Sequence, residues 1–176
     1  AIDHGNGNIK TQNRIFASGL KEAMVKPILG EYLQIDDKYY TLEGRIPYMR
    51  DKTKDNRFFL LTIYAIAEEL ELDKCNENGI IQIDLPVGLP PKHYGALYKR
   101  FEAYFQNKGI IEFVYKSRKY AICIRNVVAF PQGYAAAMTI FTDIKKYQKV
   151  YVIDIGGYTV DYLLIREGKP DLSVCD

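Results

Sequence analysis

Apolar and polar residues alternate in short stretches along most of the chain, which is the pattern of β-strands. Glycine, asparagine and aspartate separate several stretches and favour hairpin turns because they accept positive φ. Such turns are predicted at Gly5-Asn6-Gly7 and Asp36-Asp37-Lys38. We expect the stretches at 80–85 and 150–155 to be buried. The predicted strands cover residues 8–18, 32–35, 39–42, 80–85, 110–115, 120–130, 150–155 and 159–166.

Three helices are predicted between these strands. Asp55 is a suitable N-cap for the first, which runs to about Leu72. Its centre, residues 58–67, is apolar on nearly every face, so we expect it to be enclosed on all sides. Pro90-Pro91 begins the second helix and Pro131 the third, which runs to about residue 146, because proline is tolerated in a first turn.

Alternating strands and helices predict an α/β fold with a mixed sheet. Strands joined by a hairpin should be antiparallel, and strands joined through a helix should be parallel. The chain opens on Ala1-Ile2-Asp3, which reads as the end of a strand whose start is missing. We therefore expect Ile2 to pair with the strand that follows the Gly5-Asn6-Gly7 turn.

Composition narrows the class of protein. The chain has 176 residues, of which 48% are hydrophobic and 26% charged, as in globular domains. Its 24 basic and 22 acidic residues give a net charge of +2, which offers no electrostatic case for direct binding to nucleic acid. No apolar run approaches the ~18 residues of a membrane-spanning helix. Three widely spaced cysteines and the absence of a signal sequence favour a cytoplasmic protein without disulfides.

Two turns repeat one chemical arrangement near the two ends of the chain. Asp3-His4-Gly5 and Asp154-Ile155-Gly156 each place an aspartate at a strand end, immediately before a glycine turn and a returning strand. Backbone N–H groups in such a turn can bind an anion, since no Cβ blocks its approach. Lys10 is placed to reach the same phosphate, and Asp3 to accept hydrogen bonds from the water shell of Mg²⁺. Each turn alone is more often a simple hairpin, but the pair predicts a polyphosphate site.

The stretch from Asp3 to Lys10 resembles the first phosphate motif of the actin-like ATPase superfamily, and the stretch from Val152 to Asp161 resembles the second. Leu85 to Pro90 and Ile124 to Gly133, with the alanine-rich segment that follows, narrow the resemblance to bacterial and plasmid-borne actin-like proteins of the ParM type. The resemblance covers essentially the whole chain. It implies a ribonuclease-H-like mixed sheet, with a small subdomain inserted over about residues 30–75. Residues 1–176 would then be the first lobe of a longer protein.

The resemblance also implies roles for individual residues. Asp3 and Asp154 would hold a hydrated Mg²⁺, and Gln132 would orient the attacking water, which makes Gln132 and Asp154 the expected catalytic residues. Glutamine at this position departs from the ParM pattern, which often has glutamate there. The amide of glutamine cannot remove a proton at neutral pH. The expected phosphate-binding residues are Gly5, Asn6, Gly7, Asn8 and Lys10 in the first turn and Gly156, Gly157 and Thr159 in the second.

Three functions remain open at this stage. The first is a filament-forming ATPase that segregates plasmid DNA through an adaptor protein, using ATP (or GTP) and Mg²⁺. In that case hydrolysis belongs to the full-length protein, and this fragment alone would be inactive or weak. The second is another enzyme of the superfamily, similar to sugar or acetate kinases. The third is a non-catalytic interaction lobe.

Other polar residues have simpler interpretations. We expect His4 to be solvated at the first turn, and Lys52 and Lys54 to form a solvated basic loop with Arg50. For Asp161, we expect a role in supporting the second hairpin in preference to a contact with the metal.

Overall fold

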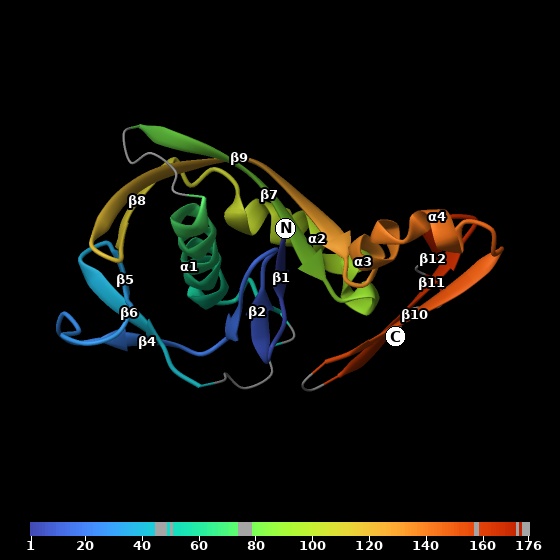
Figure 1. The fold of residues 1–176 in the computed structure, drawn as a ribbon, viewed down its shortest axis with the longest axis horizontal. Helices are drawn as coiled ribbons and strands as arrows, with labels where there is room; N and C mark the ends of the chain where they lie inside the picture. The colour runs from blue at the N-terminus through green and yellow to red at the C-terminus, as the bar shows by residue number, and fades with distance from the viewer. Residues whose placement is uncertain (45–48, 50, 74–78, 157–158, 172, 174–176) are drawn as a thin grey trace.

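A computed structural model describes residues 1–44, 49, 51–73, 79–156, 159–171 and 173. Arg50 and Gly157, which were singled out from the sequence, lie outside these residues. The elements, labelled as in Figure 1, are β1 (Ile2–His4), β2 (Asn8–Lys10), β3 (Ile15–Ala17), β4 (Leu20–Ala23), β5 (Leu33–Ile35), β6 (Lys38–Leu42), α1 (Arg57–Leu72), β7 (Ile80–Leu89), α2 (Pro91–Phe105), β8 (Ile110–Tyr115), β9 (Arg118–Pro131), α3 (Tyr134–Thr139), α4 (Phe141–Ile144), β10 (Lys149–Ile155), β11 (Val160–Arg166) and β12 (Lys169–Asp171).

In the described part of the chain, nine strands form one mixed sheet in the order β3-β2-β1-β7-β9-β8-β5-β6-β4. The central strands β1, β7 and β9 are parallel, since helices separate them in the sequence, whereas the hairpin partners on either side are antiparallel. The predicted mixed α/β sheet is therefore confirmed. A second sheet consists of three antiparallel strands in the order β10-β11-β12. It lies at one end of the molecule, and strands β4, β5 and β6 lie at the opposite end (Figure 1).

The large sheet curls around α1, which occupies its hollow (Figure 1). Every residue of α1 from Phe58 to Glu68 is buried, which confirms that its apolar centre is enclosed. The helix begins at Arg57, so the N-cap position is Asn56 and not the predicted Asp55. The Asp55 carboxylate nevertheless accepts a hydrogen bond of 2.9 Å from the backbone N–H of Arg57.

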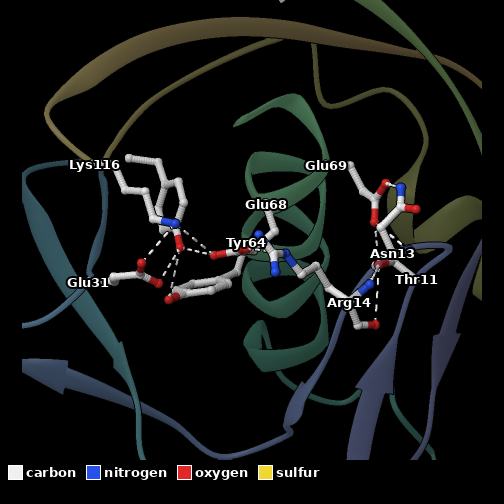
Figure 2. A network of polar contacts seen from close by, with 9 residues as sticks. Thr11, Asn13, Arg14, Glu31, Tyr64, Glu68, Glu69 and Lys116 are labelled. Carbon is white, nitrogen blue, oxygen red and sulfur yellow. Dashed lines mark hydrogen bonds and ion pairs between the residues drawn. The ribbon is translucent and has the colours of Figure 1, made fainter. Parts of the chain in front are cut away.

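Polar contacts tie α1 to both halves of the sheet (Figure 2). The buried Glu68 carboxylate accepts a hydrogen bond from the Tyr115 hydroxyl and lies 3.0 Å from Nε of Arg14. Glu69 accepts hydrogen bonds from Thr11 and Asn13. These partners come from the β2–β3 turn and from β8, which lie on either side of the central strands β1, β7 and β9 in the sheet order. The helix therefore links the two halves of the sheet.

The first half of the chain departs from prediction at its strands. Residues 8–18 form two strands, β2 and β3, because the chain turns where the N–H of Thr11 donates to the carbonyl of Arg14 at 2.8 Å. Strand β7 extends to Leu89, and it is buried at alternate positions from Leu85 onward. Of the stretch 80–85 that was predicted to be buried, only Leu85 is buried. Strand β4, which pairs with β6, was not predicted.

The second half departs at the predicted third helix and at β10. Pro131 is the last residue of β9, and the left-handed Gly133, with φ of 80°, turns the chain into the short α3 and then α4. Residues 150–155 fall in β10, whose alternate residues are exposed, so the predicted burial of this strand is wrong. The short strand β12 was not predicted either.

The subdomain expected over about residues 30–75 stays a prediction. Within that range, β5 and β6 continue the nine-stranded sheet and α1 contributes to its core. None of the helices in the described part of the chain is long and apolar enough to cross a membrane.

Candidate functional site

The first candidate turn begins where β1 ends in the middle of the large sheet. β1 pairs with β2 on one side and with β7 on the other, so Asp3 lies opposite Gly88 of β7. The turn requires glycine at its start, because a Cβ at Gly5 would lie 2.6 Å from the carbonyl oxygen of Asn8. Asn6 holds the turn with its side chain, since its Oδ1 accepts a 2.9 Å hydrogen bond from the N–H of Met49.

His4 is buried, and the expectation that it is solvated is wrong. Its ring contacts the rings of Phe58 in α1 and of Phe101 and Phe105 in α2. Thr62 Oγ1 lies 2.6 Å from His4 Nε2 and donates its own proton to the carbonyl of Phe58. Burial lowers the pKa of His4 to about 3, so the imidazole is neutral at physiological pH. His4 therefore anchors the end of β1 between the two helices.

The second candidate turn joins β10 to β11. Its strands pair in a register that sets Asp154 directly opposite Asp161. The N–H of Gly156 donates to the carbonyl of Thr159 at 2.9 Å, and the Thr159 hydroxyl donates to Asp161 at 3.1 Å. Asp161 thus supports the hairpin, as expected. Like charges at directly opposed positions are destabilising, so this carboxylate pair favours a nearby cation.

Both turns line one cavity of about 150 Å³, although they are far apart in the sequence. Every described residue that was assigned to the site from the sequence is in this lining. The lining also contains residues that were not assigned to the site from the sequence, namely Lys52, Pro90, Ile155 and Asp161. The predicted residues brought together are Asp3, Gly5, Asn6, Gly7, Asn8, Lys10, Gln132, Asp154, Gly156 and Thr159.

Asp3 and Gln132 contact each other at one side of this cavity. Gln132 lies in the turn between β9 and α3, not inside a helix as expected, and its Nε2 donates to Asp3. Gly88 leaves room for this contact, since a Cβ there would lie 3.1 Å from Cγ of Gln132. Burial raises the pKa of the Asp3 carboxyl, while Lys10, with Nζ 3.7 Å away, and Lys52 counter part of that rise.

Lys52 is a site residue that was not predicted from the sequence. Its residue surface is 4% exposed, its ammonium donates to the carbonyl oxygen of His4, and its Nζ lies 5.4 Å from the centroid of the Phe58 ring. Burial lowers the pKa of Lys52 to about 8, against the charges of Asp3 and Asp161, which raise it. The expected solvated loop is therefore wrong for Lys52. Nothing in the Lys52-Thr53-Lys54 stretch distinguishes the buried lysine from the exposed Lys54, because burial here comes from tertiary packing.

Comparison with known proteins identifies a family and a fold. Residues 1–134 match the family model described as the N-terminal domain of actin-like proteins. No curated protein sequence matches the chain.

Solved structures with the same fold include an AlfA filament bound to AMPPNP, with 16% identity and a TM-score of 0.72. The apo psk41 ParM protein has 15% identity and a TM-score of 0.74, and an archaeal actin homologue in complex with ADP has 20% and 0.71. Each alignment covers 99% of this chain, which spans 66%, 64% and 58% of the three structures respectively. At these identities the likeness is one of fold.

Replacement of Thr62 by valine tests whether His4 is a structural anchor. The substitution removes the hydrogen-bond acceptor for the buried His4 Nε2–H, so we expect the free energy of unfolding to fall by about 1–3 kcal/mol. Thr139→Val is the matched control, because Thr139 donates to the carbonyl of Ala136 at 2.7 Å on an exposed helix end. Chemical denaturation measures both. Equal, small losses in the two variants would show that His4 does not depend on Thr62.

Proposed function

Since the chain belongs to the family of actin-like proteins, through its N-terminal domain, we propose that it binds the polyphosphate of ATP with Mg²⁺ and that the full-length protein hydrolyses ATP. The observation that carries this proposal is the shared cavity. Two glycine turns from opposite ends of the chain border it, each with an aspartate at the end of the preceding strand.

The described residues around the cavity fit a polyphosphate. The first turn requires glycine at Gly5, where a Cβ would lie 2.6 Å from the nearest backbone oxygen. At Gly156 a Cβ would lie 3.1 Å from the nearest backbone oxygen, which is a tight contact. Gly7 lines the cavity, and a Cβ there would meet no heavy atom within 4 Å, so we expect space for an anion to approach the backbone. The ammonium groups of Lys10 and Lys52 supply positive charge.

The same cavity suits a hydrated Mg²⁺. Asp3, Asp154 and Asp161 line it, yet the described residues contain no group of three or more His, Cys, Asp or Glu side chains arranged to enclose a metal ion. Mg²⁺ keeps much of its water shell in proteins, so Asp3 and Asp154 would hold it through that water. When bound, Mg²⁺ neutralises phosphate charge and relieves the repulsion among these carboxylates.

We assign to Gln132 the role of orienting the attacking water. Its Nε2 donates to Asp3, which leaves the amide oxygen as the group that can accept a hydrogen bond from water. A glutamine does not remove the proton, so its contribution is to hold the water in line with the terminal phosphate. Asp3 fixes the orientation of the amide and is thereby a positioning residue as well.

Filament formation and DNA segregation are the proposed use of this chemistry. One structural neighbour is an AlfA filament bound to AMPPNP, and another is the Alp12 filament. We infer that ATP favours self-association of the full-length protein and that hydrolysis weakens it. The net charge of +2 favours an adaptor protein over direct contact with plasmid DNA.

Sedimentation of the full-length protein tests the proposed assembly. With ATP and Mg²⁺ we expect a pelleted polymer at high protein concentration, and with ADP or with EDTA we expect the protein to stay in the supernatant. Hydrolysis is followed in the same samples as released phosphate. Phosphate transfer to a sugar or to acetate, without a polymer, would instead favour a kinase of the same superfamily.

Gln132→Ala tests the hydrolytic role. Loss of water alignment should slow hydrolysis about 100-fold, while the affinity for AMPPNP stays unchanged because the phosphate turns are intact. Single-turnover hydrolysis and calorimetric titration separate the two effects. Unchanged hydrolysis in this variant would remove Gln132 from the mechanism.

Gly7→Ala tests phosphate binding without a change in the surrounding packing. The added methyl group has open space in the free protein but would take up room that a phosphate needs beside the backbone N–H. Loss of one charge-assisted hydrogen bond predicts that AMPPNP affinity falls about tenfold or more. Gly95→Ala is the control, because Gly95 also has no heavy atom within 4 Å of a built Cβ but lies in α2 and is not among the residues that line the cavity. Equal affinities in the two variants would argue against binding at the first turn.

A further inference from the structure

Lys52 has an environment that is unusual for a lysine. Lysine is among the residue types that are almost never fully buried unless paired, yet Lys52 is 4% exposed. The side chain of Lys10, which lines the same cavity, is 46% exposed. The segment that carries Lys52 leads from β6 into α1, and the Asp51 carboxylate fastens it to Arg100 of α2 at 3.0 Å. The fold thus holds this lysine against the cavity wall.

The ammonium group of Lys52 is only partly satisfied by the protein. It has three N–H donors, and the His4 carbonyl is its single hydrogen-bond acceptor among the described residues. It forms no ion pair with a carboxylate in that part of the chain, although Asp3 and Asp161 are near enough to act on it electrostatically. A buried charge without a partner is unfavourable. The remaining donors therefore call for an anion in the cavity.

The position of Lys52 indicates which phosphate it meets. Lys52 donates to the carbonyl of His4, the residue directly after Asp3, and Asp3 is also the acceptor of the Gln132 amide. If Gln132 orients the attacking water, the Asp3 side of the cavity is where the terminal phosphate lies. Lys52 is then at the end of the triphosphate tail.

We propose that Lys52 binds the terminal phosphate of the bound nucleoside triphosphate and so makes the site distinguish a triphosphate from a diphosphate. This inference rests on the nucleotide binding proposed above. Lys52 donates to the carbonyl of His4, directly before the first phosphate turn, while Met49 of the same segment donates to Asn6 within it. Loss of the terminal phosphate therefore removes a contact from the segment that leads into α1.

Affinities for AMPPNP and for ADP, measured with Mg²⁺ by calorimetry on the full-length protein, test the role of Lys52. Lys52→Met keeps a long unbranched side chain at this position but removes the charge. We expect it to weaken AMPPNP binding about 10- to 100-fold and to leave ADP binding nearly unchanged. Lys52→Arg should retain most of the preference for AMPPNP. Lys54→Met, an exposed neighbour, is the matched control and should alter neither affinity.

Each outcome decides between two roles. An equal loss of AMPPNP and ADP affinity, or no loss of either, would overturn the proposal and leave Lys52 as a strut for the first turn. If the unaltered protein bound neither nucleotide, the proposed function itself would fail, which is a different result. NMR of the protein with ¹³C-labelled lysine needs no variant. The Lys52 signal should shift with AMPPNP and not with ADP, and equal shifts with both would contradict the proposal.

Discussion

The burial of His4 between α1 and α2 is the constraint on which the site depends. The ring contacts Phe58, Phe101 and Phe105, and its Nε2 is satisfied by Thr62, so the end of β1 cannot shift without exposing apolar surface or leaving a buried donor unpaired. The residues on either side of His4 are therefore held in place as well. Asp3 precedes it and faces the cavity, and the Gly5 turn follows it.

Around that fixed point, the site collects groups from segments that are distant in the sequence. Gln132 arrives from the turn after β9, Lys52 from the segment before α1, and Asp154 and Asp161 from a hairpin of the second sheet. Among the described residues, three carboxylates and two ammonium groups line this small cavity. Charged groups of both signs around one cavity suit a site that binds a cation and a polyphosphate together.

Local signals allowed the turns, the main strands and α1 to be predicted from the sequence. Aspartate before glycine marks both candidate turns, and the continuous apolar face of α1 marks a helix enclosed by a sheet. Burial of His4 and Lys52 was not predictable, because both depend on contacts with distant parts of the chain. His4 packs against aromatic residues of α1 and α2, and Lys52 contacts the carbonyl of His4, 48 positions before it. The helix expected from Pro131 failed for a related reason, since pairing with β7 extends β9 through Pro131 and the left-handed Gly133 delays the helix.

A structure of the full-length protein with AMPPNP and Mg²⁺, by crystallography or electron microscopy, is the most direct test of the claim that both turns serve one nucleotide. We predict that the triphosphate lies between the turn at Gly5 to Asn8 and the turn at Gly156 to Thr159, with the metal between Asp3 and Asp154. Density for the phosphates elsewhere, or contacts with only one of the two turns, would contradict this claim.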